Sequence, residues 1–205
     1  MRSAATSRKV EIVRRAAEIF DSKGVAETSI EDIAVSIGIR REAVYHYFRD
    51  KGEILCDIIR PQSEALLRGM ERLMTLNLSP RVRLTLAISA HLERFNPHYI
   101  EMTVAFRELY GRSSTPGLIE LRRVWKSYEQ LWIDLVVEGQ KAGEFDETQN
   151  AKMAAFGILG MCNWASSWYR PGGDMPIEKL IESFTAIAMG GIASRTNSCR
   201  DCNSP

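Results

Sequence analysis

Apolar residues recur along this chain at intervals of three and four positions, without sustained alternation of apolar and polar residues. Such spacing places apolar side chains on one face of an α-helix, whereas a half-buried strand alternates every second residue. Glycine, proline and short polar runs divide the pattern into segments of helical length. An all-α fold with about nine helices is therefore predicted. The predicted helices span residues 7–22, 29–36, 40–47, 50–76, 80–95, 98–110, 118–142, 147–169 and 176–192.

Three local signals refine these boundaries. Thr28 precedes an apolar run and is followed three residues later by Glu31, which predicts a capping box at the start of the second helix. Pro61 falls inside the long fourth segment and predicts a kink, or a break near Arg60. Asn96-Pro97 predicts an interruption between the fifth and sixth helices.

The lengths of the helices divide the chain into two units and a tail. Residues 1–50 hold three short helices, and residues 51–193 hold the long ones. Residues 194–205 have almost no apolar side chains and are predicted to be disordered.

Composition narrows the functional classes only slightly. The formal net charge is +1, which excludes a protein that binds nucleic acid through bulk charge but permits a local basic patch. The N-terminus lacks the apolar stretch of a secretory signal, and the uncharged stretch 153–169 is shorter than the roughly 20 residues of a membrane span. A cytoplasmic protein with reduced cysteines and no membrane partner is predicted.

The first unit has the pattern of a helix-turn-helix that reads DNA. Gly38 supplies the turn between two short helices, Ala34 lets them approach closely, and Val44 fills the space between them. Three isoleucines line the inner side, namely Ile33, Ile37 and Ile39. The outward face of the third helix then carries polar side chains that can reach bases or phosphates, namely Arg40, Arg41, Glu42, Tyr45 and His46.

The run SIEDIAVSIGIRREAVYHYFRDKGEIL resembles the N-terminal domain of the TetR family of bacterial repressors. The resemblance implies a DNA-binding domain followed by a variable helical domain that dimerises and binds a small-molecule effector. It also implies a palindromic operator of double-stranded DNA. The DNA-binding residues implied in this way are Thr28, Ser29, Arg40, Arg41, Glu42, Tyr45, His46, Tyr47 and Lys51.

Several of these residues have individual roles and open alternatives. Thr28, with the amides at the start of the second helix, together with Tyr47 and Lys51, is assigned to phosphates. Tyr47 is equally well explained as a core residue. Glu42 departs from the small residue found in many family members, and a carboxylate there repels phosphate unless it accepts from cytosine N4, so its role stays open.

The resemblance also implies that the last two helices, 147–169 and 176–192, form the dimer interface. Both are rich in small residues that permit close approach between helices. A homodimer is therefore expected.

The aromatic residues of the second unit are candidates for an effector cavity, although core packing explains most such residues. The segment SSWYRPGGDMP resembles the TetR branch that senses acyl-CoA thioesters in fatty-acid or steroid catabolism. Arg170 is then a candidate for a coenzyme A phosphate, and Arg122, Arg123 and Lys126 are further candidates that solvated helix faces explain better. The predicted ligand-binding residues are Phe106, Tyr110, Trp125, Trp132, Trp164, Trp168, Tyr169 and Arg170.

Catalytic and metal-binding patterns are not found in the sequence. It contains no nucleophile elbow, phosphate-binding loop, dinucleotide fingerprint or zinc-protease motif. Cys199 and Cys202 have no second ligand pair, so neither a metal nor another cofactor is expected. Two alternatives remain: a repressor that responds to a lipophilic drug or natural product, and a helical enzyme or binding module with a vestigial DNA reader.

Overall fold

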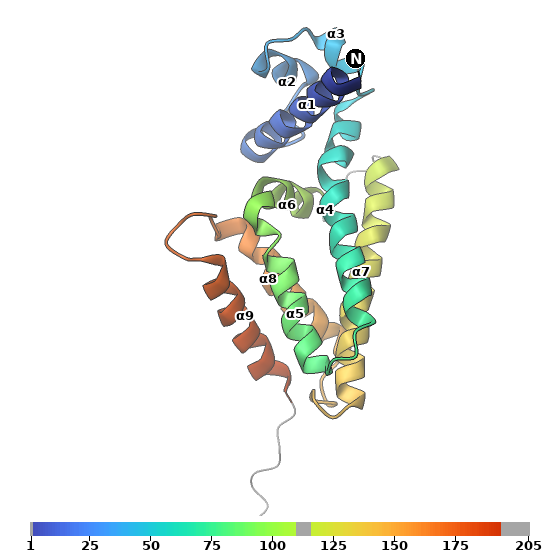
Figure 1. Cartoon of the computed structure of the whole chain (residues 1–205), viewed down its shortest axis with the longest axis vertical. Coiled ribbons are helices and arrows are strands. Elements are labelled where there is room, and N and C mark those ends of the chain that lie inside the picture. The colour runs from blue at the N-terminus through green and yellow to red at the C-terminus, as the bar shows by residue number, and fades with distance from the viewer. Residues whose placement is uncertain (1, 110–115, 194–205) are drawn as a thin grey trace, which may run out of the picture.

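A computed structural model describes residues 2–109 and 116–193 of the chain. Nine α-helices and one isolated β-bridge account for the regular structure of these residues, which confirms the predicted all-α fold. Figure 1 shows α1–α3 at one end of an elongated molecule, with α4 leading from them along the remaining helices. The helices are α1 (Arg2–Lys23), α2 (Ile30–Ser36), α3 (Arg41–Tyr45), α4 (Lys51–Met74), α5 (Pro80–Leu92), α6 (Phe95–Leu109), α7 (Pro116–Lys141), α8 (Ala151–Trp168) and α9 (Ile177–Ile192).

The three short helices share a small apolar core. Phe20 from α1, Ile33 from α2 and Val44 from α3 are fully buried, and Phe48 closes the core after α3. Gly38 lies in the turn between α2 and α3 with φ +67°, a left-handed conformation that residues with a Cβ atom rarely adopt. This core fixes the orientation of α3, so its opposite side faces outward.

The cap at the start of α2 lies one residue later than predicted. Ser29, rather than Thr28, is the N-cap, and its Oγ accepts the Asp32 amide hydrogen at 3.0 Å. The Asp32 carboxylate, rather than that of Glu31, accepts the Ser29 amide hydrogen at 2.8 Å. Thr28 with Glu31 and Ser29 with Asp32 both have the spacing of a capping box. The second pair forms the cap, because the Thr28 side chain is buried.

The long helix α4 connects the two units. It runs without a break through Pro61, so the break predicted near Arg60 is wrong. Proline removes one backbone hydrogen bond, but Ile58, Ile59 and Ser63 are buried on either side of it and hold the helix in place.

The predicted interruption at Asn96-Pro97 is also displaced. The chain leaves the helix at Glu93 and Arg94, and α6 begins at Phe95, so Pro97 lies in its first turn. Proline is tolerated there because the first amides of a helix have no partner within that helix.

The core of the second unit is built around α7. Trp132 is fully buried and Trp125 nearly so, and α7 packs against both α4 and α8. A Cβ atom built on Gly139 would lie 2.0 Å from the Phe145 ring, so the ring packs directly on the backbone of α7. Glycine is therefore the only residue at 139 that leaves this packing undisturbed.

Helices α8 and α9 have exposed apolar faces on one side of the molecule. The predicted dimer interface rests on the small residues of these helices, and three of them, Ala155, Ala165 and Ala188, are buried within the chain itself. Exposed glycines, one exposed alanine and large apolar side chains lie on these helices among exposed polar residues such as Lys152 and Glu182. They are Met153, Phe156, Gly157, Gly160, Trp164, Ala186, Ile187, Gly190 and Gly191. No helix in the described ranges has the length and hydropathy required to span a bilayer.

Some sequence predictions lie outside the described residues. They concern Tyr110, the cysteine pair Cys199 and Cys202, and the tail 194–205. The boundary predicted at residue 50 falls on Asp50, the N-cap of α4, whose carboxylate accepts the Glu53 amide hydrogen.

Candidate functional site

Helix α3 presents a polar face to solvent at the tip of the molecule (Figure 1). Val44 is the buried anchor, and the residues on the other sides of the helix are exposed. The exposed side chains include every residue predicted for base or backbone reading on this helix, namely Arg40, Arg41, Glu42, Tyr45 and His46.

The two arginines of this face differ in their surroundings from those of α1. Arg8 pairs with Glu11, and both Arg14 and Arg15 pair with Glu18 on the same helix. Within the described residues neither Arg40 nor Arg41 has an ion pair, and the Arg41 guanidinium lies 5.4 Å from the centre of the Tyr45 ring. These guanidinium groups are available for phosphates or for guanine edges.

The remaining aromatic residues of this region have mixed environments. Tyr47 is half-buried, and its ring meets the His46 ring edge-on at 5.1 Å between centroids.

Glu42 is exposed in the first turn of α3, among the residues that face outward. The structure thus places Glu42 on the same face as the arginines, while its contact with DNA stays a prediction.

The start of α2 differs from the expected phosphate site. The Thr28 side chain is buried, and its hydroxyl donates to the Gly24 carbonyl at 2.6 Å, so it faces inward rather than toward solvent. The Asp32 carboxylate accepts the Ser29 amide hydrogen and pairs with Lys23, and these contacts lower the Asp32 pKa to about 2. A carboxylate of the chain itself therefore occupies this helix terminus, while Ser29 remains exposed.

Lys51 has a structural role that its position in the sequence did not indicate. Its ammonium group donates to the carbonyls of Val25, Ala26 and Thr28 at 2.7, 2.8 and 2.9 Å. An ammonium group has three donors, and all three are used in closing the α1–α2 connection. A phosphate contact by Lys51 would compete with these bonds.

Replacement of Lys51 by methionine is expected to lower the free energy of unfolding by about 2 kcal/mol, because three carbonyls lose a charged donor. Urea denaturation measures the effect, and Arg49→Met on the exposed neighbour serves as control. Unchanged stability combined with weaker DNA binding would contradict the structural role and support the phosphate contact.

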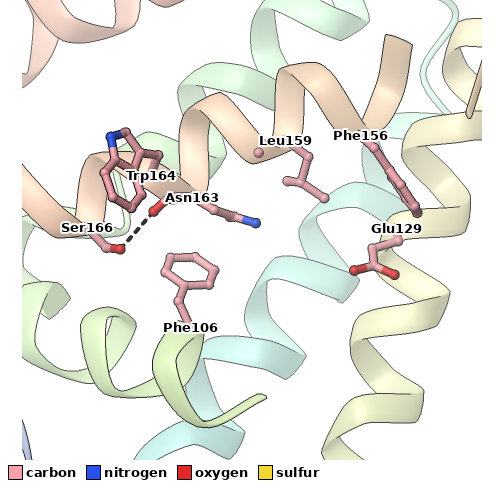
Figure 2. Close-up of a pocket in the computed structure, with 8 residues that line it drawn as sticks. Phe106, Glu129, Phe156, Leu159, Asn163, Trp164 and Ser166 are labelled. Atoms are coloured by element: carbon pink, nitrogen blue, oxygen red, sulfur yellow. Dashed lines mark hydrogen bonds between the residues drawn. The ribbon is translucent and has the colours of Figure 1, made fainter. Parts of the chain in front are cut away.

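The second unit contains a cavity of about 420 Å³ between α6, α7 and α8 (Figure 2). Phe106 from α6 and Glu129 from α7 lie across it from α8. Its walls are mainly aromatic and aliphatic, and its volume lies in the range of cavities that bind small molecules. The α8 residues that line it are Phe156, Leu159, Gly160, Asn163, Trp164 and Ser166.

The predicted ligand-binding residues are divided by this geometry. Phe106 and Trp164 line the cavity, whereas Trp125 and Trp132 are buried behind it in the core. Trp125 donates its indole hydrogen to Ser63 Oγ at 2.9 Å, which fixes it as a packing residue between α7 and α4.

The turn after α8 contributes no lining residue to this cavity. Trp168 packs near Phe184 of α9, with ring centroids 6.3 Å apart, and Tyr169 is buried. Burial raises the pKa of the Tyr169 hydroxyl, and the charge of Glu178 adds to the shift. The Arg170 guanidinium donates to the Tyr169 carbonyl at 2.9 Å.

The sequence analysis missed most of the polar lining. Asn163 and Ser166 lie three residues apart on α8, and the Ser166 hydroxyl donates to the Asn163 carbonyl at 2.7 Å (Figure 2). Polar residues inside the otherwise apolar stretch 153–169 were a visible signal in the sequence. Glu129 gave no signal because its helix carries many charged residues.

A buried histidine lies behind the cavity. His91 is fully buried on α5, and its Nδ1 lies 2.9 Å from the Tyr128 hydroxyl. Burial lowers the His91 pKa to about 4, and hydrogen bonding with Asn163 opposes part of that shift. The His91 ring stacks near Phe106, a residue of the cavity wall.

Among the described residues that line the cavity there is no cation. Glu129 is the charged residue among those that line it. Of the further basic candidates, Arg122 donates to the carbonyls of Leu109 and Glu108, and Arg123 and Lys126 are exposed on α7. Among the described residues no three potential ligands are close enough to hold a metal ion.

Comparison with known proteins places both units in one group of regulators. Residues 12–58 match the family described as bacterial regulatory proteins, tetR family, and residues 77–192 match the tetracyclin repressor-like C-terminal domain. The chain is 27% identical to the HTH-type transcriptional repressor KstR2 of Mycolicibacterium smegmatis, and the match covers 91% of each chain.

Two solved structures illustrate the similarity in fold. The ketosteroid transcriptional regulator KstR2 of Mycobacterium tuberculosis superposes with a TM-score of 0.85 at 25% identity, covering 92% of this chain and 96% of that one. AibR, solved with isovaleryl coenzyme A and operator DNA, has a TM-score of 0.77 at 18% identity, covering 88% and 97%. At that identity the match to AibR shows the shared fold alone.

Proposed function

The chain belongs to the TetR family of bacterial transcriptional regulators, and from this premise we propose that it is a dimeric repressor released from its operator by an acyl-CoA thioester. Members of this family are DNA-binding regulators rather than enzymes. The observation that carries the proposal is the combination of an exposed, unpaired arginine pair on α3 with an aromatic cavity in the second unit.

The DNA-binding part of the proposal rests on α3. Arg40 and Arg41 begin the helix, and Tyr45 and His46 extend the same outward surface by one turn. Helix α3 would enter the major groove, where guanidinium groups pair with guanine or with flanking phosphates. Ser29 is exposed and Tyr47 is half-buried, and their contacts with the phosphate backbone are part of the proposal. Lys51 would have to give up its bonds to the chain to join them.

The dimer rests on the exposed apolar faces of α8 and α9. Trp164 is 69% exposed and Ile187 is 61% exposed, and a monomer would leave both in water. Gly160 and Gly190 lie on the same exposed sides and permit close approach of a second copy. Two α3 helices spaced about 34–36 Å apart would then read the two halves of a palindromic operator.

The effector part rests on the cavity. Phe106, Phe156 and Trp164 offer apolar surface to an acyl group, and Asn163 and Ser166 offer hydrogen bonds to a thioester or ring oxygen. Phe156, Gly160 and Trp164 are also exposed on the dimer face, so the cavity opens toward the partner copy. Effector binding would favour a spacing of the two α3 helices that no longer matches the operator.

The names of two similar regulators support an acyl-CoA thioester as the class of effector. The regulator KstR2 is named for ketosteroids, and AibR binds isovaleryl coenzyme A. Arg170 is proposed to contact a coenzyme A phosphate outside the cavity, because the described residues of the lining offer no cation.

Release of the operator tests this proposal directly. Purified protein bound to a fluorescent operator fragment is titrated with octanoyl-CoA, a steroid-derived acyl-CoA, the corresponding free acids and coenzyme A alone. At least one thioester is expected to release DNA at a concentration about tenfold or more below that of its acid, because only the thioester carries the coenzyme A phosphates that Arg170 is proposed to contact. Arg170→Gln should reduce this preference, and Lys141→Gln at the far end of α7 should not.

One observation favours a second candidate effector. Glu129 gives the cavity lining a negative charge, which suits a neutral lipophilic drug or natural product better than a polyphosphate. Release by uncharged apolar compounds with no response to any thioester would establish this alternative and overturn the acyl-CoA proposal.

A further inference from the structure

A second cavity, of about 360 Å³, lies between α4 and α5 on the other side of the core. Leu66, Met70 and Leu73 of α4 face Leu86 and Ala87 of α5 across it. Its volume is also in the range of small-molecule sites, and its walls are predominantly apolar. This cavity shares no lining residue with the cavity between α6, α7 and α8.

Two arginines distinguish the second cavity from the first. Arg72 from α4 and Arg94 at the end of α5 belong to its lining, and neither guanidinium has an ion pair within residues 2–109 and 116–193. Glu93 is the acidic residue of the lining, and its carboxylate accepts the Ser89 hydroxyl at 2.8 Å. The lining therefore combines apolar walls with a net positive charge.

The two cavities are separated by a stack of three rings. Tyr128 belongs to the lining of the second cavity and Phe106 to that of the first. His91 lies between them, with ring centroids 5.9 Å from each and interplanar angles of 14° to Tyr128 and 26° to Phe106. A ligand that moves Tyr128 would thus act on the wall of the other cavity.

We propose that the α4–α5 cavity is a second ligand site, which binds an anionic amphiphile with its apolar chain between α4 and α5 and its headgroup at Arg72 and Arg94. Planar guanidinium groups bind carboxylate and phosphate oxygens in pairs, and the apolar walls supply the contact for a hydrocarbon chain. Because α4 follows α3 in the chain and packs against α1, occupation of this cavity acts on the helix that joins the two units. The site goes beyond the acyl-CoA proposal and does not depend on it.

Calorimetric titration of the full-length protein without DNA tests the site. The probes are decanoate, decyl phosphate and decanol, which share one chain and differ in the headgroup. Each of the two anions is expected to bind at least about tenfold more tightly than decanol, because the alcohol has no charge to pair with the arginines. Preference for decanoate or for decyl phosphate identifies the source of the anion as a carboxylic acid or a phosphate ester.

Three variants locate the binding. Arg72→Gln combined with Arg94→Gln should weaken both anions about tenfold or more, while Arg68→Gln, whose side chain pairs with Glu64 outside the cavity, should leave them unchanged. Gly69→Leu should abolish binding by filling the cavity. A Cβ atom at Gly69 meets no atom within 4 Å, and leucine favours a helix over glycine, so this variant is expected to fold.

The results separate this site from the first cavity. Trp164 lines the first cavity and not the second, so Trp164→Ala should leave decanoate binding unchanged even where it impairs release by acyl-CoA. Equal affinity for decanol and decanoate, or unchanged anion binding in Gly69→Leu, would overturn the proposal.

Discussion

Replacement of Arg41 by alanine is expected to weaken binding to operator DNA by about tenfold to a hundredfold. Arg41 is exposed in the first turn of α3, has no ion pair among the described residues, and lies beside the ring of Tyr45. The Arg41 guanidinium breaks no ion pair when it binds DNA, because it has none among the described residues of the unbound protein. Its loss therefore removes binding energy without an offsetting gain.

Fluorescence anisotropy measures the affinity for a labelled DNA fragment from the region upstream of the gene that encodes this chain, at several salt concentrations. If Arg41 contacts a phosphate, the slope of the logarithm of affinity against the logarithm of salt falls by about one; if it contacts a base, specificity relaxes at one position. Arg14→Ala is the matched control, because Arg14 is exposed but paired with Glu18 on α1.

Unfolding by urea should be the same for Arg41→Ala and for the unaltered protein, because the side chain contributes nothing to the core. If Arg41→Ala binds DNA as tightly as the unaltered protein, α3 is not part of the DNA-binding surface. That result would favour the alternative of a helical enzyme or binding module with a vestigial DNA reader.

The helical pattern of the chain was predictable because each helix has a local cause. Apolar spacing, the glycine turn at Gly38 and proline at the start of α5 are all visible in the sequence and do not depend on distant contacts. The errors fall where tertiary packing decides. Pro61 lies in a helix held by buried neighbours, and the cap of α2 moves to Ser29 because Thr28 is buried.

The candidate sites divide in the same way. The outward face of α3 follows from the position of Val44 alone, so the exposed arginines could be placed from periodicity. The role of Lys51 could not, because its acceptors lie 23 to 26 residues earlier in the chain. The cavity proposed for the effector depends on how three helices approach each other, and periodicity cannot tell Trp164, which lines it, from Trp132, which lies behind it.

The titration of His91, which is buried between Tyr128 and Phe106, is expected to make the stability of the protein strongly dependent on pH. Burial lowers its pKa from 6.5 to about 4 in the folded protein. Between these values the unfolded chain binds more protons at this position than the folded protein does, so stability falls as the pH falls. The contribution is complete above pH 6.5, and about 3 kcal/mol is lost by pH 4.

Urea unfolding at intervals from pH 7 to pH 4.5 measures this dependence. His91→Gln should flatten it, because glutamine can still bond to the Tyr128 hydroxyl but does not titrate. The comparison uses the slope against pH, so a uniform loss of stability in the variant does not obscure it. His46→Gln removes an exposed histidine and should keep the steep dependence. The Asp32 carboxyl, whose pKa is about 2, gives a constant stabilisation across this window, because its effect is lost only as the pH falls from 3.8 toward 2. A slope in His91→Gln equal to that of the unaltered protein would mean that His91 accepts a proton in the folded state, and the stack between the two cavities would then carry a charge.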